Sequence, residues 1–219
     1  MAEINSKPQY EDSIAKEKII NELKHVTANK NNASFSNTDT DGNVIADSKE
    51  YLEDMFSRKF VQNGGKLIFC ETDQEMLSNI QAAVKEFNWI DIYCYNNSIG
   101  NILSTAEIKF KNNIGDLPSV PVGMTKCDAL IANQGSIVIS NESDKKRKLS
   151  AIAHTHVVFA TIDQIVPDFK AAIEKMKKPN NRLPDTIEII SGPSSTTVAE
   201  CNPIIGAQGP KELYLFLLA

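Results

Sequence analysis

The sequence predicts an α/β protein in which a mixed sheet carries an antiparallel hairpin insert and follows a helical N-terminal arm. Three observations support this fold class. Short apolar runs alternate with helical patterns from residue 66 onward, as in parallel βαβ units. Two apolar runs flank a Gly-containing tip at 133–135, as in a hairpin. Residues 1–63 hold two helical patterns joined by a polar segment.

These patterns divide the chain into an arm, residues 1–63, and an α/β domain, residues 64–219. In the arm, apolar residues recur at near-helical spacing over 11–29 and again over 47–62. Between them, Asn, Ser, Thr, Asp and Gly break the periodicity, which predicts a polar linker near 30–45.

Each element of the domain is predicted from its own pattern, with period two for strands and about 3.6 for helices. The predicted strands are 66–70, 90–95, both runs of 127–140, 154–161, 186–190 and 212–218. The predicted helices are 73–87, 98–106 and 163–178. In the last of these, Pro167 belongs to the first turn or starts a second helical segment.

Composition and charge limit the class of protein. The chain of 219 residues is 42% hydrophobic and 23% charged, which is ordinary for a globular protein with a real core. A formal net charge of −5 argues against a general nucleic-acid binder, whose surface is basic. The first residues lack an apolar core, and no run approaches the ~20 apolar residues that cross a bilayer. We therefore expect a cytoplasmic protein without membrane insertion.

Cofactor motifs are not found in the sequence. The four cysteines are scattered without a CxxC pair, so we expect reduced thiols rather than a metal or iron–sulfur site. The sequence contains no HExxH, GxSxG, Walker A or GxGxxG motif, which removes the commonest hydrolase, NTPase and dinucleotide-binding functions. We expect no cofactor and no metal in this chain.

The stretch 191–200, SGPSSTTVAE, is the first candidate site. It follows an apolar run directly, and Ser194 or Ser195 is placed to cap a following helix. Backbone N–H groups at a helix start, together with hydroxyls, form a natural anion site. The candidate ligand-binding residues here are Gly192, Pro193, Ser194, Ser195 and Thr196. The alternative is that the serines cap the helix and bind nothing.

Three further polar segments could line the same pocket. The hairpin tip offers polar donors on a rigid scaffold, a Gly-rich connection precedes the last strand, and a short basic run could supply a cation. The candidate residues are Asn133, Gln134, Gly135 and Ser136 at the tip, Gln208 and Gly209 in the connection, and Arg147 in the basic run. Each also has a plain structural explanation: a surface tip, a chain bend and a solvated loop.

Two residues could act as a general base, His156 and Glu200. His154 and His156 are two residues apart in a predicted strand and therefore share one face. Two histidines without a nearby carboxylate or cysteine ligand do not make a metal site.

Three blocks resemble the LUD-domain family, whose best-known members are lactate-utilisation proteins of the C type. The blocks are VGMTKCDALIANQGSIVIS, LSAIAHTHVVFATIDQIV and ISGPSSTTVAECNPIIGAQGPKELYLFLL, and the resemblance covers roughly 65–219. It implies a fold similar to the sugar-phosphate isomerase and CoA-transferase-like superfamily. It also implies a role beside iron–sulfur partner proteins in the oxidation of L-lactate to pyruvate.

The chain departs from the family pattern at three ionisable positions. Asn133 stands where the family usually has an acidic residue, Val198 where it has Asp, and Gln208 where it has His. Glu200 and His156 remain at matching places. An amide at 133 is no nucleophile at neutral pH, so the pattern favours a retained fold with altered or lost chemistry.

Three hypotheses about function follow, and they leave open whether the chain is an enzyme. The first is an accessory component of L-lactate or related organic-acid utilisation that acts with iron–sulfur or other redox proteins. The second is a non-catalytic module that binds or senses a small carboxylate or phosphate anion through a degenerate active site. The third is an isomerase or acyl-transfer enzyme that uses Glu200 or His156. The expected ligand is a small organic acid or a phosphorylated small molecule.

Overall fold

The computed structural model describes residues 51–113, 115, 117–140, 144–177, 182–196, 204–206 and 209–219. They belong to one compact unit, Lys49–Ala219. The helix predicted over 11–29 and the linker predicted near 30–45 lie outside the described residues.

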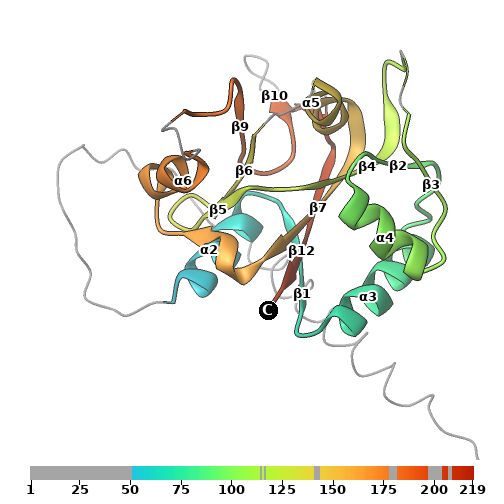
Figure 1. Cartoon of the computed structure of the whole chain (residues 1–219), viewed down its shortest axis with the longest axis horizontal. Coiled ribbons are helices and arrows are strands. Elements are labelled where there is room, and N and C mark those ends of the chain that lie inside the picture. Colours follow the sequence, from blue (N-terminus) through green and yellow to red (C-terminus); the bar gives the residue numbers. More distant parts are fainter. Residues whose placement is uncertain are drawn as a thin grey trace, which may run out of the picture. The chain divides into compact units, whose positions relative to one another are not determined.

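A six-stranded sheet forms the centre of this unit, in the order β1-β12-β7-β4-β2-β3 (Figure 1). Every neighbouring pair in it is parallel. Its strands are β1 (Lys66–Cys70), β2 (Ile92–Cys94), β3 (Phe110–Lys111), β4 (Val120–Lys126), β7 (Ala153–Thr161) and β12 (Glu212–Leu218). The predicted α/β fold class is confirmed.

The predicted hairpin lies in a second sheet, in the order β8-β5-β6-β9. Its strands are β5 (Ala129–Ile131), β6 (Ser136–Ser140), β8 (Ile165–Val166) and β9 (Ile187–Ile190). β6 pairs antiparallel with β5 and β9, whereas β8 runs parallel to β5. A short antiparallel pair, β10 (Ser195–Thr196) and β11 (Ile204–Ile205), completes the strands of the described residues.

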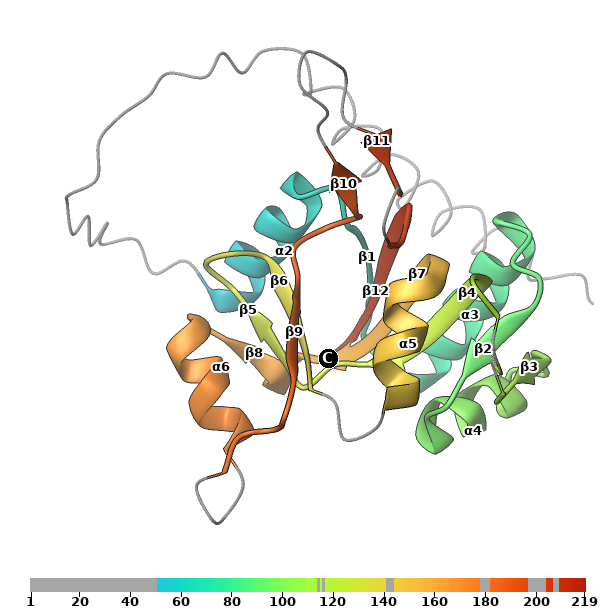
Figure 2. The same cartoon turned by 90° about the horizontal axis from the view of Figure 1, so that it is seen from above.

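Helices and the second sheet cover both faces of the central sheet, as a parallel sheet requires (Figure 2). Helices α3 and α4 pack on one face, and α2, the β5–β6 hairpin and α5 pack on the other. The helices are α2 (Leu52–Gln62), α3 (Asp73–Glu86), α4 (Asn97–Thr105), α5 (Asp144–Ile152) and α6 (Phe169–Met176), with a 3₁₀ turn η1 at Ile162–Gln164.

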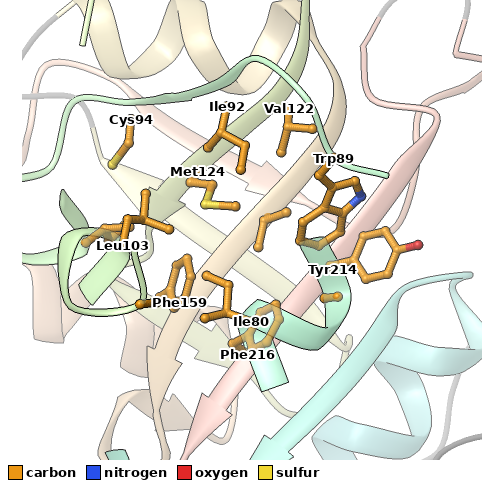
Figure 3. Close-up of a cluster of buried hydrophobic side chains, with 14 of the residues drawn as sticks. Ile80, Trp89, Ile92, Cys94, Leu103, Val122, Met124, Phe159, Tyr214 and Phe216 are labelled. Atoms are coloured by element: carbon orange, nitrogen blue, oxygen red, sulfur yellow. The ribbon is translucent and has the colours of Figure 1, made fainter. Parts of the chain in front are cut away.

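Strand β12 contributes to two hydrophobic cores at once because its side chains alternate between the faces. Tyr214 and Phe216 enter the core beneath α3 and α4, where they meet Trp89 and Phe159 (Figure 3). The leucines at positions 213, 215 and 217 enter the core beneath α2 and the hairpin. The run ELYLFLL is therefore apolar without alternation, as expected of a central parallel strand.

Two elements that contain or adjoin a Pro residue differ from the prediction. The segment predicted as helical over 163–178 begins as η1 and β8, and α6 starts only after Asp168, whose side chain caps it; this fits the alternative in which a second helical segment begins near Pro167. Pro167 disfavours helical backbone in the residue before it. Strand β4 has no counterpart in the prediction, since Pro121 and Gly123 both weaken a strand pattern.

Helix α5 was also missed. The basic run, residues 145–148, has a solvated loop as its plain prediction, but it lies in α5, whose Leu149 packs over Gly123 of β4. A Cβ at position 123 would lie 2.9 Å from Leu149 Cδ1, so Gly123 permits the close approach of the helix.

Replacing Leu215 by Ala should destabilise the fold by about 2–5 kcal/mol, because it leaves a cavity in the middle of the central sheet. Urea unfolding followed by circular dichroism measures this loss. Leu183→Ala is the matched control: Leu183 is 41% exposed, and its loss should cost under about 0.5 kcal/mol. Equal midpoints for the two variants would contradict the central position of β12.

Candidate functional site

Three of the predicted polar segments meet at the turn between α2 and β1. Asn63 Nδ2 donates to the carbonyl oxygens of Gln134 (2.8 Å) and Gly135 (3.4 Å) at the hairpin tip. The hydroxyls of Ser136 and Ser191 lie 2.7 Å apart. We call this region, formed by residues 63–65, 133–136, 191–194, 206 and 209–210, the turn cluster.

Backbone hydrogen bonds join the Gly-rich connection to the same place. The N–H of Ser194 donates to the Pro210 carbonyl at 2.8 Å, and the N–H of Gly206 donates to the Ser194 carbonyl at 2.8 Å. The Cβ of Ser194 lies 3.1 Å from the position that a Cβ on Gly209 would take. Segments far apart in the sequence thus converge at the amino ends of β1 and β12.

Glycines in the turn cluster make room for protein backbone. Gly192 has φ +90°, and a Cβ there would lie 2.1 Å from the Asn63 carbonyl oxygen. Gly135 has φ +61°, and a Cβ there would lie 2.3 Å from the backbone nitrogen of Phe60. Another part of the chain therefore occupies the space that these two glycines leave open.

The helix predicted to start after Ser194 or Ser195 is wrong for the described backbone. Ser195 and Thr196 form β10 instead, paired with Ile205 and Ile204 of β11. This pairing gives the backbone strand conformation, so no helix starts at Ser195 or Thr196; residues 197–203, which the predicted helix would also include, lie outside the described residues.

Several predicted site residues lie outside the described part of the chain. Glu200, Gln208 and Val198 are among them, as are the side chains of Arg147 and Thr196. Their roles stay predictions. Of the tip residues, Asn133 is exposed and its N–H donates to the Pro167 carbonyl at 3.2 Å, which fixes the tip against the segment before α6.

His156 is fully buried in β7, where the strand register places it beside Leu213 of β12 and Gly123 of β4. Its Nε2 lies 2.8 Å from the hydroxyl oxygen of Thr125 on β4. Its Nδ1 has no hydrogen-bond partner among the described residues. Burial lowers the pKa of His156 from 6.5 to about 4, because the cation would lose its hydration. The imidazole is therefore neutral at neutral pH and suits hydrogen bonding better than proton uptake.

His154 shares the strand face of His156, as predicted, but it is exposed at the start of β7. Within the described residues there is no group of three or more His, Cys, Asp or Glu side chains that could hold a metal ion. The histidine pair thus splits into one surface residue and one buried residue.

A small hollow lies at the other end of the sheet, where β2 and β4 finish. Its volume is about 20 Å³, room for about one water molecule. Its lining residues are Tyr95, Asn96, Met124, Thr125, Lys126 and Leu149. We call it the β2–β4 hollow. Through Thr125 it is next to the buried His156.

The strand order explains why the hollow forms there. From β2 the chain passes through α4 to β3 at the sheet edge, whereas from β4 it passes through the second sheet to β7 on the other side. The two connections leave neighbouring strands in opposite directions. Such a switch point is where open α/β sheets bind ligands, outside the carboxyl ends of the strands. Sequence reasoning missed these residues because only strand order brings them together.

Comparison with known proteins agrees with this fold. The family model described as the LUD domain matches residues 53–218. The chain belongs to the LUD domain family. A solved structure of a DUF162 family protein from Deinococcus radiodurans has the same fold, with a TM-score of 0.53 at 15% identity, covering 77% of this chain and 96% of that one.

Curated relatives match over a shorter stretch. "Lactate utilization protein C" of Anoxybacillus flavithermus is 30% identical over 108 residues, which are 49% of this chain and 48% of the relative. "Uncharacterized protein YkgG" of Escherichia coli is 28% identical over 113 residues, 50% of this chain and 49% of the relative. The chain therefore spans about half the length of the curated relatives it matches. Among the described residues, we find no helix that combines the length and the hydrophobicity of a membrane span.

Gly192→Ala should destabilise this LUD domain more than Gly115→Ala. Both glycines have positive φ, but a Cβ meets the Asn63 carbonyl oxygen at 192 and nothing within 4 Å at 115. The left-handed backbone costs roughly 1–2 kcal/mol in each variant, and the clash should add about 1–3 kcal/mol at 192 only. Thermal unfolding of the two variants measures the difference. Equal melting temperatures would show that the turn cluster is loosely packed.

Stability should fall as the pH is lowered from 6.5 towards 4, because the unfolded chain protonates His156 before the folded chain does. The loss attributable to this group should reach about 3 kcal/mol and level off below pH 4. Urea midpoints of wild type and His156→Gln across this range measure it, since the variant lacks this contribution. His154→Gln removes an exposed histidine and should keep the wild-type pH dependence. Parallel curves for wild type and His156→Gln would refute the buried neutral imidazole.

Proposed function

We propose that this chain is a cytoplasmic accessory component of L-lactate or related organic-acid utilisation that acts with redox partner proteins. The observation that carries the proposal is the LUD domain match over 53–218, together with relatives that are named lactate utilization protein C. Oxidation of L-lactate to pyruvate removes two electrons and two protons from the substrate. The proposal assigns the electron acceptor to an iron–sulfur partner and gives this chain a supporting role.

The geometry around His156 supports a binding role rather than proton transfer within this chain. A general base works best with a pKa near the operating pH, and burial moves the pKa of His156 to about 4. At the hairpin tip, Asn133 replaces the acidic residue that the family resemblance implies. A second candidate function, a non-catalytic module that senses a small anion, is favoured by the same two observations. Isomerase or acyl-transfer activity has less support.

Deleting the gene should abolish or strongly slow growth on L-lactate as the carbon source, and leave growth on pyruvate unchanged. The reason is that the proposed step lies between the two acids. A plasmid copy of the wild-type gene should restore growth on L-lactate. Normal growth of the deletion strain on L-lactate would contradict the proposal.

The partner is tested in the same strain. An affinity-tagged copy purified from lactate-grown cells should bring down a protein with the visible absorbance and iron content of an iron–sulfur cluster. The tagged copy expressed alone in a foreign host should lack both. If the lactate-grown preparation also lacks iron, the assignment of the electron acceptor to a bound partner is wrong.

A further inference from the structure

The β2–β4 hollow has a hydroxyl at its wall whose hydrogen bonding is set by a buried imidazole. Thr125 is 5% exposed, and its Oγ1 lies 2.8 Å from His156 Nε2. The other ring nitrogen, Nδ1, is buried without a hydrogen-bond partner among the described residues. One of the two nitrogens carries the proton in a neutral imidazole, and the choice decides what Thr125 can do.

The tautomer of His156 with the lower free energy carries the proton on Nε2. A buried N–H without an acceptor is rarer in folded proteins than an acceptor with an unused lone pair, so the unpaired Nδ1 is assigned the lone pair. His156 Nε2–H then donates to Thr125 Oγ1. The Thr125 hydroxyl proton is left to donate elsewhere, and Thr125 lines the hollow.

The other polar lining groups also offer hydrogen-bond donors. Asn96 uses its Oδ1 to cap α4, accepting from Ser98 N at 2.9 Å and Ile99 N at 3.2 Å. Its Nδ2 group is the remaining part of that side chain, and it has two protons to donate. Lys126 is exposed at the end of β4 and brings a positive charge. None of the six lining residues is acidic.

We infer that the β2–β4 hollow binds the carboxylate group of a small organic acid, with Thr125 and Asn96 donating hydrogen bonds and Lys126 supplying the charge. Three observations carry the inference: the position of the hollow at the switch point, the donors that line it and the absence of acidic residues among them. Because the hollow of about 20 Å³ has room for about one water-sized group, one carboxylate oxygen enters it and the rest of the acid faces outward. A single lining cation matches one negative charge better than a phosphate dianion.

This site adds a binding location to the proposed function. The assignment of organic acids as its ligands rests on that proposed function. It differs from the turn cluster, which lies at the amino ends of the strands and is filled by its own backbone contacts. A substrate acid bound at this site would lie at the carboxyl ends of β2 and β4 while a partner protein acts on it.

Backbone amide shifts in two-dimensional NMR test the site directly, using L-lactate, pyruvate and inorganic phosphate as separate probes on the full chain. The two carboxylates should shift the amides of Asn96, Thr125 and Lys126 saturably, and phosphate should shift them less. Thr125→Val should weaken carboxylate binding by about tenfold, whereas Thr125→Ser, which keeps the hydroxyl, should bind as the wild type does. Lys126→Gln should weaken binding severalfold.

Two control variants match these changes. Thr155→Val removes a buried hydroxyl from β7 on the opposite face of the sheet, where Thr155 Oγ1 lies 3.4 Å from a Glu212 oxygen. Lys170→Gln removes an exposed lysine from α6. Both should leave carboxylate binding unchanged. Lys126 is exposed, so Lys126→Gln decides the question if Thr125→Val does not fold.

Three outcomes would overturn the site. The first is that neither carboxylate shifts the amide signals saturably at tens of millimolar. The second is that the largest amide shifts lie in the turn cluster. The third is that folded Thr125→Val and Lys126→Gln bind the carboxylates with unchanged affinity. A stronger response to phosphate than to both carboxylates would overturn the assigned ligand class. Binding without a growth defect of the deletion strain would leave the site standing and reject the proposed function. A growth defect without carboxylate binding would reject the site and leave the proposed function standing.

Discussion

The parallel pairing of β12 between β1 and β7 is the interaction on which the rest of the structure depends. The chain's last strand enters beside its first and is buried on both faces, with Leu215 on one side and Phe216 on the other. A parallel sheet is stable only when both faces are covered, so one layer of helices cannot suffice. Helices α3 and α4 supply one cover, while α2, the hairpin and α5 supply the other.

This arrangement gives the two ends of the sheet different properties. At the amino ends of β1 and β12, turns from several segments pack backbone against backbone, and Gly192 and Gly135 are needed because no Cβ fits. At the carboxyl ends of β2 and β4, the chain leaves neighbouring strands in opposite directions and side chains line a hollow. Glycine-rich turns serve packing here, and the polar groups best placed for a ligand lie at the opposite end.

His156 links the core to that end of the sheet. A fully buried imidazole with one nitrogen unpaired among the described residues costs folding free energy, and its lowered pKa adds a dependence on pH. Buried polar groups with such a cost in folding free energy are often found at functional sites. The hydrogen bond to Thr125 connects this cost to a residue that lines the hollow.

The sequence alone determined the α/β class, the family and most elements, because the apolar runs 66–70 and 212–218 and the helical spacing of 73–87 are local patterns. It also indicated that the polar turns matter, but not whether they meet a ligand or one another. Only the tertiary structure decided that Gly192 faces the Asn63 carbonyl and that Thr125, Asn96 and Lys126 share a hollow. The physical reason is that both depend on strand order and register, which long-range pairing fixes and local pattern does not.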